Sequence, residues 1–215
     1  MTILYTSLII CLILMMFYYI YKVIIYKFDS FSIDNNIYQY SSIDGNKYYV
    51  HNKHEDMQLA ADIFAKIDKS INNFLNLLYE KYKNSDNYKR REVAELMMTR
   101  YHTASLRENS PLNVDKDTSY TINKGDIIAI CIRSGINYGI HDIQTIMFVV
   151  LHELTHLAIK AYDHPDEFWQ VFKFVLEESE SMNIYISPNY ALHPVEYCGI
   201  TINYSPRWDF SIPSI

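Results

Sequence analysis

Residues 152–156 read H-E-L-T-H, a pattern that places two histidines and a glutamate inside an otherwise apolar stretch. Residues four apart lie on the same face of an α-helix, one turn from each other, so the imidazoles of His152 and His156 can bind one metal ion together. Glu153 points about 100° further round the helix, where it can act as general base on a water bound to that ion. The pattern therefore predicts a helix that carries a metal site.

The whole stretch from 142 to 162 is expected to form one strongly apolar helix, because hydrophobic residues flank the motif on both sides. Polar and charged groups in the middle of a buried helix are costly unless a partner satisfies them. Metal coordination provides such a partner, and core histidines paired with a carboxylate are the alternative. A hydrolytic zinc site has three protein ligands and one open position, so a third ligand has to come from outside the motif.

Several residues after the motif are candidates for this third ligand. His164 follows His156 by eight residues, beyond the expected end of the helix, and a short loop could bring it back to the metal. Its neighbour Asp163 is an alternative. Glu177 or Glu178 on the next helix would give a site of two histidines and one glutamate, although both also fit an exposed acidic helix end.

The remainder of the chain predicts an α+β domain over residues 55–215. Apolar residues recur at intervals of three and four, which is typical of amphipathic helices, and two β-rich runs flank a short turn with glycine, which predicts a hairpin. The expected elements are helices at 55–83, 90–98, 142–162 and 166–181, hairpin strands at 119–122 and 126–133, a short strand at 47–50, and a tail from 183 to 215 that is mostly loop.

The N-terminal residues 2–21 carry no charge. As a helix they would span about 30 Å, the hydrocarbon thickness of a bilayer, and aromatic residues followed by Lys22 and Lys27 are typical of an interfacial anchor. This predicts a transmembrane anchor at 1–27 with membrane contact through 2–21, followed by a juxtamembrane linker at 28–54. The lysines after the span predict a single-pass membrane protein whose C-terminal domain is cytoplasmic.

The net charge and the cysteines of the chain argue against some other kinds of function. The net charge of −6 gives no support for nucleic-acid binding, which usually needs a basic face. No C-x-x-C pair is present, so a thiolate zinc ribbon is excluded by spacing. The three cysteines, Cys11, Cys131 and Cys198, fit free thiols in a reducing compartment, and a single disulfide is not excluded.

The motif and the segment H-P-D-E-F-W at 164–169 together resemble the WLM and SprT-like zinc metallopeptidases, in which H-E-L-x-H is followed, after a turn, by H-x-x-x-F-W. The spacing from the second to the third histidine is intermediate between those of the two groups. Residues 192–199 are also similar to uncharacterised WLM-like proteins of large DNA viruses. The resemblance covers 119–182 and implies a small zincin fold with Zn²⁺ as cofactor, His152, His156 and His164 as ligands, and Glu153 as the catalytic base.

The activity implied by the resemblance is hydrolysis of a peptide bond in a protein or peptide substrate. Zinc would lower the pKa of its bound water toward about 7 and polarise the scissile carbonyl, while Glu153 would carry the proton to the leaving amine. The tetrahedral oxyanion needs one further donor. Tyr197 is the first candidate for this catalytic role, and His193 and Tyr162 are the others.

Two further questions remain open at the level of sequence. The strand at 126–133 is expected either at the edge of the sheet, where an extended peptide could pair with it, or as a plain buried strand. The alternative function is a non-catalytic, membrane-tethered scaffold with structural zinc. The intact Glu153 counts against it, because structural zinc sites are normally closed by four ligands and have no use for a base.

Overall fold

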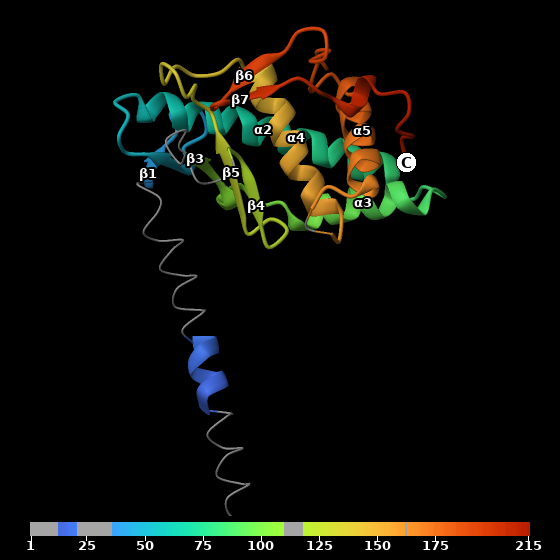
Figure 1. The fold of residues 1–215 in the computed structure, drawn as a ribbon, viewed down its shortest axis with the longest axis horizontal. Helices are drawn as coiled ribbons and strands as arrows, with labels where there is room; N and C mark the ends of the chain where they lie inside the picture. The colour runs from blue at the N-terminus through green and yellow to red at the C-terminus, as the bar shows by residue number, and fades with distance from the viewer. Residues whose placement is uncertain (1–12, 21–35, 110–117, 162) are drawn as a thin grey trace, which may run out of the picture. The chain divides into compact units, whose positions relative to one another are not determined.

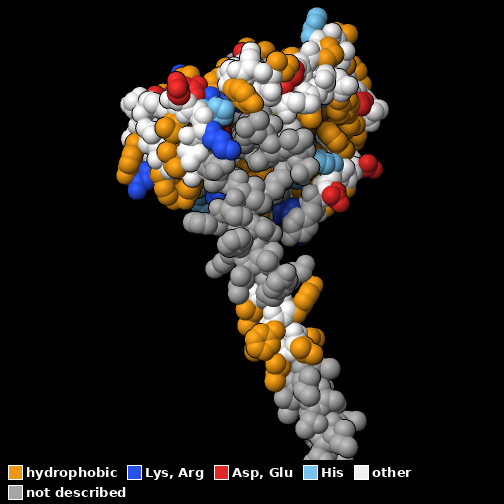
Figure 2. Space-filling model, turned by 60° about the vertical axis from the view of Figure 1, so that its left-hand side comes forward, with side chains coloured by type: hydrophobic (Ala, Val, Ile, Leu, Met, Phe, Trp, Pro, Cys, Tyr) orange, Lys and Arg blue, Asp and Glu red, His pale blue; other side chains and the backbone are white. Residues whose placement is uncertain are grey.

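The computed structural model describes residues 13–20, 36–109, 118–161 and 163–215, and the chain divides into two compact units, 1–35 and 36–215. In the first unit, the described residues 13–20 form a helix. All of its side chains are hydrophobic, and each is 43–71% exposed (Figure 2).

The predicted transmembrane anchor is wrong. No helix among the described residues is long and apolar enough to cross a membrane. The helix at 13–20 rises about 12 Å, which is short of the roughly 30 Å of a bilayer core. The remaining anchor residues, 2–12 and 21–27, lie outside the described part of the chain. The single-pass topology, the membrane contact and the cytoplasmic orientation were predicted from this anchor and are corrected with it.

The second unit combines a five-stranded sheet, four long helices and a separate two-stranded hairpin in the part of the chain that the structure describes (Figure 1). The elements are β1 (Asn36–Tyr40), β2 (Lys47–His51), α2 (Met57–Tyr82), α3 (Tyr88–Arg100), the short helix η1 (Thr103–Ser105), β3 (Leu106–Asn109), β4 (Tyr120–Ile122), β5 (Ile127–Cys131), α4 (Ile143–Ala158), α5 (Asp166–Ser181), β6 (Val195–Tyr197), β7 (Ile200–Ile202) and η2 (Pro206–Trp208).

The strand order of the main sheet is β1-β2-β3-β5-β4. The β4–β5 hairpin is antiparallel as predicted, but β2, β3 and β5 are parallel neighbours, so the sheet is mixed. Residues 36–40, expected within a linker, form β1, and the short strand expected at 47–50 is present as β2. Of the two positions left open for the strand at 126–133, β5 takes the buried one, between β3 and β4. Among the described strands, β1 and β4 hold the two end positions.

One face of this sheet is covered by helices. The register aligns Leu106, Ile128 and Thr121 on neighbouring strands, and Tyr48 projects from the same face. The ring of Tyr48 stacks on α2, and Thr121 is hydrogen-bonded to Glu153 of α4. The helices α2 and α4 therefore cover the same face, and α3 and α5 both pack against α4 (Figure 1).

The turn between β4 and β5 depends on Gly125. The backbone has φ of 49° at Asn123, 59° at Lys124 and 124° at Gly125, and the last value suits only glycine. A Cβ at this position would lie 2.5 Å from the carbonyl oxygen of Arg100. The glycine thus allows the hairpin to approach the end of α3, close to where α4 also ends.

The C-terminal tail contains a hairpin that the prediction of a loop missed. Strands β6 and β7 are joined by Cys198 and Gly199, both with positive φ, which is the geometry of a two-residue hairpin turn. Cys198 forms a disulfide with Cys131 at the end of β5, with the two Cα atoms 6.4 Å apart. The expectation that these two cysteines are free thiols is therefore wrong, since the fold brings together residues 67 apart in sequence.

Candidate metal centre

The helix α4 carries the motif at its C-terminal end. It begins where the Asp142 carboxylate accepts hydrogen bonds from two backbone N–H groups of the first turn, at 2.8 and 3.3 Å. It ends at Ala158, earlier than the predicted residue 162, because Ile159 is extended. The Arg100 guanidinium donates to the Leu157 carbonyl at 2.6 Å, which satisfies an orphan acceptor of the last turn. The early end frees a loop that leads back to the motif.

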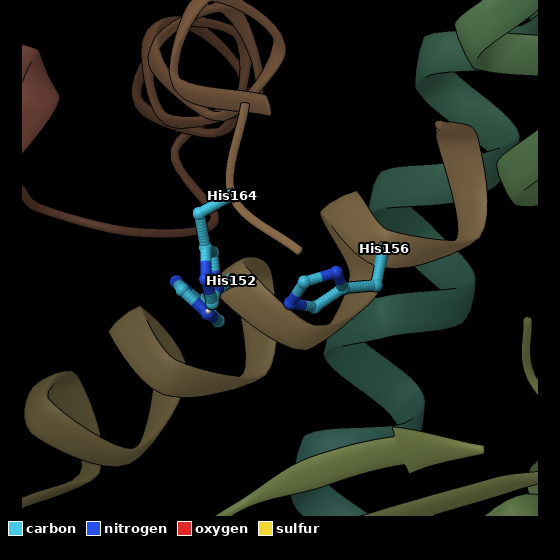
Figure 3. A group of neighbouring side chains, drawn as sticks. All are labelled: His152, His156 and His164. Carbon is cyan, nitrogen blue, oxygen red and sulfur yellow. Dashed lines mark hydrogen bonds between the residues drawn. The ribbon is translucent and has the colours of Figure 1, made fainter. Parts of the chain in front are cut away.

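Three imidazoles converge at this point. His152 and His156 lie one turn apart on α4, and His164 comes from the loop before α5 (Figure 3). One ligand atom of each ring lies within 4.8 Å of the others, and Nε2 of His164 is 2.9 Å from Nε2 of His152. The ring centroids are 4.9–5.2 Å apart. The structure therefore brings together the three residues that the family resemblance implies as ligands.

One phenylalanine ring packs against all three imidazoles. Phe168, fully buried in the first turn of α5, has its ring centroid 4.8 Å from His152, 4.6 Å from His156 and 4.5 Å from His164. The next residue, Trp169, lies 5.7 Å from the ring of His164. The F-W pair that follows the third histidine thus has a structural reason, because it holds the imidazoles in their orientation.

The local environment keeps the motif histidines in the form that binds metal. Burial, together with the neighbouring His156 and His164, lowers the pKa of His152 to about 3. Burial also lowers the pKa of His156 to about 4, with smaller contributions from His164 and Lys124. Neutral imidazole offers a lone pair to a metal ion. Three imidazole nitrogen donors facing one point match the chemistry of a zinc site with three protein ligands.

Glu153 is buried beside the histidines and is hydrogen-bonded to strand β4. Its Oε2 accepts a hydrogen bond of 2.8 Å from the hydroxyl of Thr121 in β4. The carboxylate and the three histidines all line one cavity of about 520 Å³. The remaining lining residues are Thr118, Ser119, Tyr120, Thr121, Lys124, Asp163 and Ile200. A substrate in this cavity would therefore meet the candidate ligands and the candidate base together.

The other candidates for the third metal ligand lie in different surroundings from His164. Asp163 lines the cavity and is exposed. Glu178 is buried away from it, where its carboxylate accepts hydrogen bonds from Lys81 at 2.6 Å and Tyr82 at 2.8 Å. Glu177 is partly exposed and does not line the cavity. His164 is thus the candidate whose ligand atom meets those of the motif.

The candidate oxyanion donors lie in different surroundings. The Tyr197 hydroxyl donates to the Cys131 carbonyl at 2.6 Å and lies 2.8 Å from the hydroxyl of Ser119, so its one proton is used within the fold. Burial raises the pKa of Tyr197, which keeps this proton in place. His193 is exposed and does not line the cavity, and Tyr162 lies outside the described residues.

Two residues that contact the motif, Thr121 and Phe168, have roles that the sequence did not reveal. Thr121 belongs to a strand that was predicted, but nothing local shows that its hydroxyl would face a residue 32 positions later. Phe168 belonged to the segment that carries the family resemblance, with no role of its own. The register of β4 on β5 decides the first contact, and the packing of α5 on α4 decides the second.

The chain is similar to a known domain family and to several viral proteins. The family model described as WLM domain matches residues 87–192. An uncharacterised protein of Acanthamoeba polyphaga mimivirus is 37% identical over 166 residues, which cover 77% of this chain and 82% of the relative. An uncharacterised protein of Invertebrate iridescent virus 3 is 36% identical over 72 residues, 34% of this chain and 45% of that protein.

Among solved structures, the crystal structure of Wss1 from Saccharomyces cerevisiae is similar with a TM-score of 0.43 and 17% identity, covering 62% of this chain and 87% of that one. WLM proteins are related to zinc metallopeptidases, so the family match supports a metalloprotease-like protein. The match to the WLM model and the extended similarity to the mimivirus protein together show that this chain belongs to the WLM domain family.

Proposed function

We propose that this chain is a zinc-dependent metallopeptidase that hydrolyses peptide bonds in a protein or peptide substrate. The observation that carries the proposal is the meeting of His152, His156 and His164 around one point, on the wall of a cavity that Glu153 also lines. Three ligands with space for solvent are typical of catalytic zinc sites, whereas structural sites are closed by a fourth. Membership of the WLM family supports the same reading.

Each residue has a separate role in this proposal. His152, His156 and His164 would hold a zinc ion, which supplies Lewis acidity for water and for the scissile carbonyl. Glu153 accepts a proton from the attacking water and donates it to the leaving amine. Thr121 donates a hydrogen bond of 2.8 Å to one oxygen of that carboxylate and so fixes the side chain that lines the cavity. Phe168 keeps the three rings from turning apart.

The proposal is tested by separating metal binding from hydrolysis. Glu153→Gln should retain one zinc per chain and lose cleavage of a quenched fluorescent peptide, because the amide cannot accept the proton. His164→Ala should lose most of its zinc, measured by elemental analysis after dialysis. Glu95→Gln, an exposed residue on α3, is the matched control and should change neither quantity.

The results also separate this function from a non-catalytic zinc scaffold. A scaffold predicts bound zinc in the wild type with no hydrolysis of any peptide in a diverse library, and equal behaviour of wild type and Glu153→Gln. Full activity in Glu153→Gln would remove the general base from the mechanism. Full zinc retention in His164→Ala would shift the third ligand to Asp163, the carboxylate that lines the same cavity.

A further inference from the structure

A second cavity, of about 260 Å³, adjoins the metal centre and has a different character. It shares His152, Glu153, Thr118, Ser119 and Ile200 with the first cavity, so the two meet at the catalytic carboxylate. The rest of its lining is contributed by two helices, a hairpin and the residues that follow it: Phe148 and Val149 of α4, Trp169 and Phe172 of α5, Tyr197, Thr201 and Ile202 of β6–β7, and Asn203 and Tyr204.

The floor of this cavity is apolar. Phe148, Val149 and Phe172 are buried, and the rings of Phe148 and Phe172 pack 5.3 Å apart. Tyr197 contributes its ring and not its hydroxyl, because that hydroxyl donates to the Cys131 carbonyl. Burial of apolar surface is therefore the interaction that this floor offers to a ligand.

Among the described residues that line the cavity, no charged partner is present beyond the metal centre. Apart from the tyrosines, His152 and Glu153 are the only titratable residues of this described lining, and both already belong to that centre. A lysine or aspartate side chain placed here would lose its hydration without gaining an ion pair, which is costly. An apolar side chain meets no such penalty.

The size of the cavity suits a large side chain. An apolar protein cavity of about 150 Å³ holds benzene, so about 260 Å³ accommodates a phenylalanine or leucine side chain with room to spare. The rim is formed on one side by Trp169 and Tyr204, whose rings pack 5.5 Å apart at nearly a right angle, and on another by the exposed Thr201. These side chains thus form walls of a space that adjoins the catalytic carboxylate.

We infer that this cavity is a specificity pocket that takes one large apolar or aromatic side chain of the substrate, from a residue next to the bond that is cleaved. Residues of an extended peptide are spaced about 3.3 Å apart, so a peptide whose scissile carbonyl lies at Glu153 has only its nearest side chains within reach of the pocket. The inference rests on the proposed peptidase function, and it adds the class of substrate.

The first test is a set of quenched peptides that differ only in the two residues flanking the cleavage site, assayed with the zinc-loaded full chain. Phenylalanine or leucine at one of these positions should give a kcat/KM about 10- to 100-fold higher than alanine, and lysine and aspartate should be cleaved no faster than alanine. Mass spectrometry of the products identifies which flanking position is read. Equal cleavage of all peptides would overturn the inference.

A pair of substitutions ties the preference to the pocket. Thr201→Phe adds a ring at an exposed lining position and should reduce the preference for phenylalanine over alanine to less than about threefold, with the alanine peptide cleaved at a similar rate. Thr99→Phe makes the same change on α3, away from both cavities, and should keep the wild-type ratio. An unchanged ratio in Thr201→Phe would refute the assignment of the pocket.

A binding measurement distinguishes failure of the pocket from failure of the peptidase function. If no peptide is cleaved, the proposed function fails, and the pocket is judged by binding of N-acetyl-phenylalanine amide and N-acetyl-alanine amide to the same protein, followed by chemical-shift changes. Selective binding of the phenylalanine compound that is lost in Thr201→Phe supports the pocket. Equal shifts with both compounds contradict it.

Discussion

The substitution Phe168→Leu tests how the metal centre is supported. The Phe168 ring is fully buried and contacts all three imidazoles, at 4.5, 4.6 and 4.8 Å between centroids. Each aromatic pair contributes about 0.5–1.5 kcal/mol beyond the area that it buries. Three contacts at the lower value amount to about 1.5 kcal/mol, which corresponds to about tenfold in a binding constant.

Leucine keeps an apolar side chain at this position but removes the ring that orients the histidines. The imidazoles can then turn apart in the metal-free protein, and zinc binding has to restore their arrangement. We therefore expect the zinc dissociation constant to rise by about tenfold. The zinc dissociation constant is measured by competition with a chromophoric chelator at fixed pH. The free energy of unfolding of the same protein is measured by urea titration.

The matched control is Phe174→Leu, the same change on the same helix. Phe174 is 1% exposed and packs on Tyr82 and Arg90, away from the histidines. Both variants should lose about 1–3 kcal/mol of unfolding free energy, because each substitution removes ring contacts and buried volume, but only Phe168→Leu should lose zinc affinity. Equal zinc affinities in the two variants would refute the reasoning.

Three more predictions follow from the described contacts. Thr121→Val removes the hydroxyl that donates to Glu153 and should lower kcat by about tenfold with zinc content unchanged, because a hydrogen bond to a charged group contributes about 1.5–3 kcal/mol. Thr121→Ser keeps a hydroxyl and should have the wild-type kcat. Steady-state kinetics check this, and an unaltered kcat in the valine variant would contradict it. Burial lowers the pKa of His51 from 6.5 to about 4, so the unfolded chain takes up a proton that the folded chain excludes, and urea titrations should show the free energy of unfolding decreasing as the pH falls from 6.5 toward 4. The decrease should be shallower in His51→Gln, and identical slopes would argue against this assignment. Reduction of the Cys131–Cys198 disulfide, which joins residues 67 apart, should lower the free energy of unfolding by about 4 kcal/mol on the loop-entropy model. The stability of the double variant Cys131→Ser, Cys198→Ser should not change when reductant is added. An equal response to reductant in both proteins would rule out the disulfide as the cause.

Local patterns in the sequence predicted much of the domain. The apolar spacing predicted α5 with its observed bounds, Asp166–Ser181, and α2 to within two residues at each end. The β-rich runs around Gly125 predicted the antiparallel pairing of β4 with β5. These features depend on contacts between residues close together in the chain, so helical period and turn chemistry are sufficient to reveal them.

Features that join distant segments were missed, left open or wrongly predicted. The strand expected at 126–133 was left open between a sheet edge and a buried position, and the pairing of β5 with both β3 and β4 makes it a buried inner strand. The Cys131–Cys198 disulfide and the hydrogen bond from Thr121 to Glu153 likewise link residues that no local pattern relates. The uncharged run at 2–21 was predicted to be a membrane anchor from its length and from the aromatic and basic residues at its end, and its described part is a helix too short to cross a bilayer.

The sequence by itself determined that two histidines share a helix face and that a glutamate stands beside them, because four residues make about one helical turn. It also narrowed the third ligand to a few residues. Only the tertiary structure decided that His164 meets the pair, because the early end of α4 and the packing of Phe168 under the rings set the path of the intervening loop. The apolar cavity beside Glu153 arises in the same way, from walls that three separate elements bring together.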